Sequence, residues 1–133
     1  MQEPIAAYWI LLAGALMPLP LVIMAKAGKA YDNADPRNPA ALSTPFKKAA
    51  FGAHANCLEA FPFFAAAVLL AAVRHAPAEA INVAAWVWLA ARLAYVAAYL
   101  AGQGTARSLI WLGGAGASIY LVVIAITRGT GVA

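Results

Sequence analysis

Charged residues are scarce in this sequence. Only 11% of its 133 residues are Asp, Glu, Lys or Arg, whereas 65% are hydrophobic. A soluble domain carries about 25% charged residues, because its surface must face water. The composition therefore excludes an ordinary soluble domain and predicts an integral membrane protein.

The sequence also has few groups that could hold a disulfide or a metal. The single cysteine, Cys57, excludes a disulfide within the chain. No zinc-ligand spacing, phosphate-binding glycine loop or nucleophilic serine turn occurs. Asp32 and Asp35 are two carboxylates in a polar stretch, and without a third ligand they fit turn-forming roles better than metal binding. We therefore expect no metal site.

Stretches that are long and apolar enough to cross a bilayer occur four times, given that about 20 helical residues span the hydrocarbon. They cover residues 5–25, 49–73, 81–101 and 108–127. A polar loop at residues 26–48 joins the first two spans, and Ser43 or Thr44 followed by Pro45 predicts a helix start near its end. The sequence thus predicts one all-α domain, an integral membrane bundle of four transmembrane helices.

Lysine and arginine collect on one side of these spans. Short cytoplasmic loops hold an excess of such residues in membrane proteins. One side has only Arg74 and Arg128. The other side has Lys26, Lys29, Arg37, Lys47, Lys48 and Arg107. We therefore expect loop 26–48 in the cytoplasm and both termini outside. This topology accounts for the net charge of +4, and no basic patch with interleaved aromatic residues suggests a nucleic-acid partner.

Two charges of opposite sign lie within the spans. An ionisable group in hydrocarbon is unfavourable unless it finds a partner, so such groups are functional candidates. At about 1.5 Å per helical residue, Glu59 and Arg92 lie about 15 and 14 Å from the cytoplasmic ends of their spans. We predict that they are counter-ions. A pair that only holds helices together remains an alternative interpretation.

Helical phase groups further polar residues with this pair. Residues three or four apart share a helix face. Two such stripes are Gly52, Asn56, Glu59 and Phe63, and Trp88, Arg92, Tyr95 and Tyr99. Their matching depths predict a shared pocket that opens to the cytoplasmic side. His54 lies on nearly the opposite side of the helix from Glu59, so phase alone does not place it in this pocket.

These residues carry a family resemblance. The segments AHANCLEAFPFF (53–64) and RLAYVAAYLAG (92–102), followed by Arg107 and Ser108, resemble the MAPEG family, the membrane-associated proteins of eicosanoid and glutathione metabolism. The resemblance covers nearly the whole chain. The run YDNADPR (31–37) is similar to a bacterial branch of the family, which implies a bacterial inner membrane.

The resemblance implies a homotrimer of four-helix protomers that binds glutathione, as a cosubstrate, between subunits. The positions that match the family's glutathione-binding residues are His54, Asn56, Glu59, Arg92, Tyr95 and Tyr99. Arg107 matches an arginine proposed to stabilise the thiolate, and Ser108 follows it as a serine does in the prostaglandin synthase branch. Both are therefore candidate catalytic residues.

The function implied by this resemblance is a glutathione transferase or peroxidase that acts on lipophilic electrophiles. The sequence departs from the family at Ala49 and Gly52, where relatives commonly carry arginines. Another branch of the family binds lipid without catalysing a reaction. A non-catalytic, lipid-binding membrane scaffold is therefore the alternative function.

Overall fold

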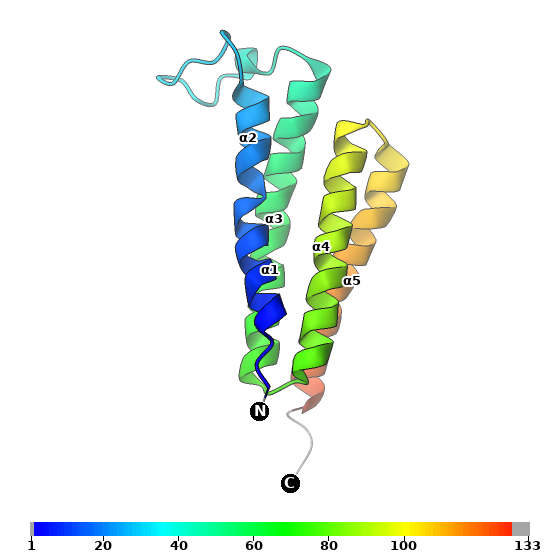
Figure 1. Ribbon diagram of the computed structural model, residues 1–133. Coiled ribbons are helices and arrows are strands. Elements are labelled where there is room, and N and C mark those ends of the chain that lie inside the picture. The colour runs from blue at the N-terminus through cyan, green and yellow to red at the C-terminus, as the bar shows by residue number, and fades with distance from the viewer. Residues whose placement is uncertain (1, 129–133) are drawn as a thin grey trace.

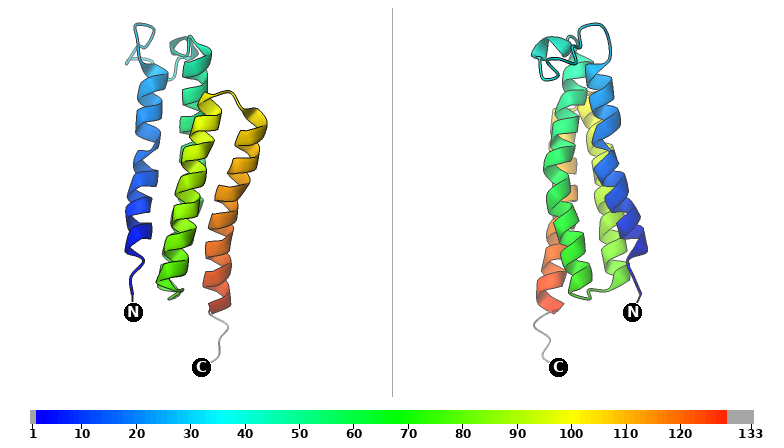
Figure 2. Two further views of the ribbon diagram at one scale, coloured as in Figure 1. Left: turned by 45° about the vertical axis from the view of Figure 1, so that its right-hand side comes forward. Right: turned by 90° about the vertical axis from the view of Figure 1, so that its left-hand side faces the viewer.

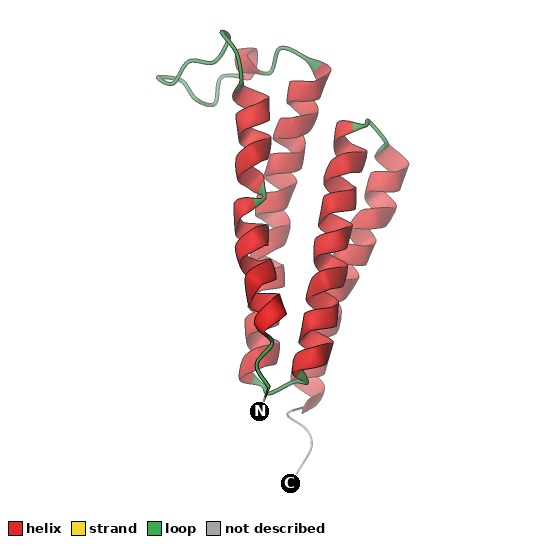
Figure 3. Ribbon diagram, in the orientation of Figure 1, coloured by secondary structure: helices red, strands yellow, loops and turns green. Residues whose placement is uncertain are grey.

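The computed structural model describes residues 2–128, which form helices and loops with no strand among them (Figures 1 and 3). The helices are α1 (Ile5–Leu16), α2 (Pro18–Lys26), the short 3-10 helix η1 (Pro39–Ala41), α3 (Pro45–Val73), α4 (Ala78–Leu100) and α5 (Gly104–Arg128). Four stretches are long and apolar enough to span a membrane: Ile5–Lys26, which combines α1 and α2, and the helices α3, α4 and α5. The predicted four-span, all-α fold is confirmed.

Three of the helices begin earlier than the predicted spans. α3 begins at Pro45, α4 at Ala78 and α5 at Gly104, because a helix extends through the polar interface where charged residues are tolerated. The predicted start of α3 is confirmed: Thr44 Oγ1 accepts a hydrogen bond from the Lys47 backbone N–H at 3.2 Å. The early start of α5 puts Arg107 and Ser108 on a helix.

The first span is interrupted at Met17, between α1 and α2. Pro18 and Pro20 lack the N–H groups that would bond to the carbonyls of Gly14 and Leu16, so regular helical bonding fails here. The two halves also have different neighbours. α2 packs on α3, whereas α1 contacts α4 as well as α3.

The start of α1 and the end of α5 lie at one end of the bundle, and the loop between α2 and α3 lies at the other (Figures 1 and 2). Arg107, near the start of α5, shares the loop's end with the loop lysines, whereas Arg74 and Arg128 lie at the terminal end. The basic residues are thus separated between the two ends as the four-span topology requires. We call these the loop end and the terminal end.

The core is centred on two stacked aromatic rings. Phe64 of α3 and Trp88 of α4 have ring centroids 3.9 Å apart and planes within 3° of each other. Gly14 allows α1 to approach Trp88 and the neighbouring Phe61, since a Cβ atom at residue 14 would lie 3.0 Å from both side chains. Trp88, although in phase with Arg92, is therefore a core residue.

Asn82 of α4 stabilises the start of α1. Its Oδ1 accepts a hydrogen bond from the Ala7 backbone N–H at 2.9 Å, and α1 has no capping side chain of its own. We expect Asn82→Ala to destabilise the protein by about 1 kcal/mol, because a helix-terminal N–H loses its partner. Asn82→Asp, which keeps the acceptor, is the matched control. Thermal unfolding in detergent measures both, and equal midpoints for the two variants would contradict this role.

Candidate functional site

Arg92 is a buried arginine at the contact of α3 and α4. Its side chain is 2% exposed, and Nη2 donates to Asn56 Oδ1 at 2.8 Å. The same nitrogen lies 3.7 Å from Cys57 Sγ, while Nε is buried without a hydrogen-bond partner. The guanidinium carbon lies 4.3 Å from the centre of the Tyr95 ring. A charged group is thus held among neutral partners.

The predicted pairing of Glu59 with Arg92 is wrong within one chain. Glu59 is exposed, and Arg92 bonds to Asn56 instead. Helical phase separates the two α3 residues by about 60°, so only one of them can face α4 directly. Within residues 2–128 no carboxylate lies within ion-pair distance of Arg92. Its positive charge is therefore not neutralised by an ion pair within the described residues.

Two tyrosines connect Arg92 to Arg107. Tyr95 is buried, and its ring meets the ring of Tyr99 edge-on with centroids 5.8 Å apart. Tyr99 in turn lies under the guanidinium of Arg107, 4.3 Å from its central carbon. We call Asn56, Arg92, Tyr95, Tyr99 and Arg107 the arginine–tyrosine cluster. Phase and depth had predicted that the residues of α3 and α4 meet, and the structure brings them together.

Arg107 and Ser108 border a cavity of about 200 Å³ whose other walls are Tyr95 and Trp111. The Ser108 hydroxyl donates to the Gly104 carbonyl at 3.2 Å. Trp111 was not among the predicted site residues. Its spacing of four from Arg107, which puts both on one helix face, was the signal available in the sequence. Trp111 also lines a smaller cavity, of about 50 Å³, beside Arg92.

His54 lies outside the arginine–tyrosine cluster. Its Nδ1 lies 3.0 Å from the Pro18 carbonyl oxygen, so the ring points toward α2. Its ring also lies 6.0 Å from that of Phe51. The structure therefore agrees with helical phase for this residue, and His54 joins α3 to the start of α2.

Gly52 makes room for Tyr99. A Cβ atom at residue 52 would lie 2.6 Å from Tyr99 Cζ and would overlap its hydroxyl oxygen. Tyr99 thus occupies the space into which the side chain of any larger residue at position 52 would project. In this chain Tyr99 therefore fills space that the arginine expected from the family resemblance would enter.

We expect Gly52→Ala to destabilise the protein by about 1 to 3 kcal/mol, because the new methyl group must displace Tyr99. The matched control is Gly116→Ala, where nothing lies within 4 Å of an added Cβ. That change should be neutral or slightly stabilising, since alanine favours helix. The thermal unfolding midpoints of the two variants measure this difference in stability. Equal midpoints would mean that Tyr99 moves aside at no cost in stability.

Asp32 has a turn-forming role. Its Oδ1 accepts a hydrogen bond from the Ala34 backbone N–H at 2.8 Å, and its carbonyl accepts one from the Asp35 N–H. Among residues 2–128 no group of three His, Cys, Asp or Glu side chains is placed to hold a metal ion.

The sequence model of the MAPEG family matches residues 6–127. The chain belongs to the MAPEG family. The match covers all but the first residue of the first span and the last residue of the fourth, and it includes every residue of the arginine–tyrosine cluster, so the predicted resemblance is confirmed. Neither a search of curated proteins nor a search of solved structures found a match. Four apolar helices and membership of this family make it an integral membrane protein.

Proposed function

We propose that this MAPEG protein binds glutathione and uses its thiolate to attack a lipophilic electrophile, as a transferase or a peroxidase. The observation that carries the proposal is the pair of arginines, Arg92 and Arg107, joined through two tyrosines at the edge of a cavity. The MAPEG family includes glutathione-dependent enzymes, which supports this choice of ligand.

The two arginines suit the two anionic parts of glutathione. Arg92 has no carboxylate partner in the described chain and can receive a glutathione carboxylate through its remaining N–H donors. Arg107 would stabilise the thiolate, because a permanent positive charge lowers the pKa of a nearby thiol. The thiol proton passes to water. In a transferase the sulfur lone pair then forms a bond to the electrophilic carbon while the bond from that carbon to its leaving group breaks, and the leaving group departs with that electron pair. In a peroxidase the sulfur attacks a peroxide oxygen, the O–O bond breaks, and a second glutathione thiol displaces the hydroxyl from sulfur to give the disulfide and water. Asn56, Tyr95 and Tyr99 would orient the tripeptide.

The exposed carboxylate of Glu59 supports a site completed by another copy of the chain, in a homotrimer. The cavity at Arg107 has about 200 Å³, below the roughly 300 to 1,000 Å³ usual for small-molecule sites. A second protomer packed against α3 would supply a further wall. It would also cover Glu59, which would otherwise face hydrocarbon unpaired. Glu59 would there bind the α-ammonium of glutathione.

The excess of basic residues at the loop end supports a cytoplasmic position for that end, with both termini outside. Arg107 lies near the start of α5 at this end, so the site would open to the cytoplasm. We propose that the protein resides in a bacterial inner membrane.

Calorimetry with glutathione on the detergent-solubilised protein tests this proposal. We expect saturable binding that Glu59→Gln weakens about tenfold, equivalent to one charge-assisted hydrogen bond. Glu79→Gln, at the terminal end, is the matched control and should bind as the unmodified protein does. A complete absence of binding heat and of any glutathione-dependent rise in unfolding temperature would refute the proposal.

The second candidate function is a non-catalytic lipid-binding scaffold. Ala49 and Gly52 stand where relatives commonly carry arginines, so the loop end has two fewer positive charges than it would with those arginines. Tyr99 also fills the space beside Gly52. Both features favour a less anionic ligand. This function predicts lipid that remains bound through purification, detected by native mass spectrometry. It also predicts no thiolate absorbance when glutathione is added.

A further inference from the structure

An apolar groove lies between α4 and α5 toward the terminal end, away from the arginine–tyrosine cluster. Its volume is about 560 Å³, within the range usual for small-molecule sites. Small residues, including Ala80 and Gly116, make up its floor, and a Cβ atom built on Gly116 would have no neighbour within 4 Å. The groove therefore exists because these positions lack large side chains.

The walls of the groove suit an alkyl chain. Val83, Val87 and Tyr120 line it, and they are 56%, 49% and 48% exposed. From Glu79 to Val87 the groove follows α4 for eight residues, or about 12 Å. Both helices belong to membrane spans, so this surface lies along the hydrocarbon. One extended chain can lie in it without displacing any side chain of the floor.

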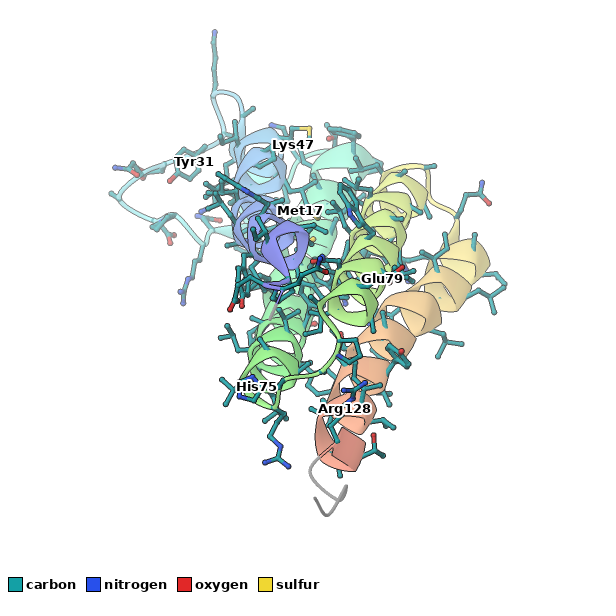
Figure 4. The ribbon with its side chains drawn as sticks, turned by 60° about the horizontal axis from the view of Figure 1, so that its bottom comes forward. Met17, Tyr31, Lys47, His75, Glu79 and Arg128 are labelled. Atoms are coloured by element: carbon teal, nitrogen blue, oxygen red, sulfur yellow. The ribbon has the colours of Figure 1, made fainter. Side chains whose placement is uncertain are left out.

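The outer end of the groove is acidic. Glu79, in the first turn of α4, lines the groove and two adjoining cavities of about 430 and 490 Å³, which Glu3 also lines. Glu3 accepts a hydrogen bond from the Tyr8 hydroxyl at 3.0 Å, whereas Glu79 has no hydrogen-bond or ion-pair partner among residues 2–128. Figure 4 views the molecule from this end and labels Glu79 there.

The described cationic side chains at the terminal end do not pair with the carboxylate of Glu79. Arg74 is directed to α5, where its Nε donates to the Ala125 carbonyl at 3.4 Å. Arg128 terminates α5, and His75 lines one of the adjoining cavities. An anionic head group near Glu79 and Glu3 would be repelled by both carboxylates. A cationic head group would be attracted by them.

We propose that this groove binds an amphipathic ammonium ion, with its single alkyl chain between α4 and α5 and its protonated amine at the carboxylate of Glu79. The apolar walls provide affinity through burial of the chain, and the acidic end selects the cation. Because it uses neither arginine of the cluster, the proposal stands independently of glutathione chemistry.

The test uses decylammonium as the probe and decanol as its neutral counterpart, with the full chain solubilised in a maltoside detergent. We expect decylammonium to raise the unfolding temperature in a saturable way, and decanol to bind at least fivefold more weakly. Glu79→Gln should weaken decylammonium binding by about fivefold, as expected of an interfacial ion pair.

A matched pair of glycine variants tests the position of the chain. Gly116→Leu fills the groove and should abolish binding of both probes. Gly113→Leu, three residues earlier on α5 and outside the groove, should leave binding unchanged. Normal binding by Gly116→Leu would overturn the proposal. Equal affinity for decanol and decylammonium, with no effect of Glu79→Gln, would also overturn it. Phosphatidylethanolamine that stays bound in native mass spectra and resists displacement by decylammonium would overturn the assignment to a single-chain amine.

Discussion

Arg107→Ala is expected to lower glutathione-dependent turnover about a hundredfold, the usual effect of removing one group that stabilises developing negative charge. Arg107 stacks on Tyr99 at the wall of the cavity, where its charge can act on a thiolate. Affinity for glutathione should change by less than about fivefold, because Arg92 and Glu59 would still hold the ends of the tripeptide. The measurement is conjugation of a chromogenic electrophile, together with thiolate absorbance.

Arg128→Ala is the matched control for this experiment. It removes the same charge from the other end of α5, far along the helix from Arg107. Arg107→Lys should retain part of the activity, since it keeps the charge and loses the flat group that stacks on Tyr99. If Arg107→Ala turned over the electrophile as fast as the control, the thiolate role would be wrong.

Arg92→Met is expected to stabilise the protein by about 1 to 3 kcal/mol and to weaken glutathione binding at least tenfold. Arg92 is 2% exposed, has no carboxylate partner in the described chain, and leaves its Nε without a hydrogen bond. The hydrogen bond to Asn56 and the contact with the Tyr95 ring compensate only part of the desolvation of this arginine, so an apolar side chain of similar length should be more favourable there. Arg92 would then serve ligand binding rather than the stability of the fold.

The thermal unfolding midpoint and calorimetry with glutathione measure the two effects in one protein preparation. Arg92→Met leaves Asn56 Oδ1 without its donor, so the double variant Arg92→Met/Asn56→Leu is the stricter measure of stability. A lower midpoint in both variants would show that Arg92 stabilises the fold. It would then support the interpretation in which the polar residues only hold helices together.

The fold was predictable because membrane spans depend on composition and length. The four apolar stretches and the Thr44 start of α3 follow from such local rules. Depth and helical phase also predicted that Arg92 shares a pocket with Asn56. They predicted Glu59 as its direct partner, which is wrong, because two residues about 60° apart on one helix are separated only by the lateral position of the neighbouring helices.

Other features of the site depend on contacts between distant segments. The bond of His54 to the Pro18 carbonyl requires α2 to lie against α3, and nothing in either segment's sequence specifies that register. The contact between Gly52 and Tyr99 likewise joins residues 47 positions apart in the sequence. Trp111 could have been found, because its spacing from Arg107 puts both on one face of α5.

The shared space of Gly52 and Tyr99 also constrains how this protein can diverge. An arginine at position 52 would require the Tyr99 side chain to leave its present place, because one volume would otherwise have to hold both side chains. A larger residue at position 52 would therefore be accommodated by another Tyr99 rotamer or by a smaller residue at position 99. Either change would take away the aromatic ring that now lies beneath Arg107.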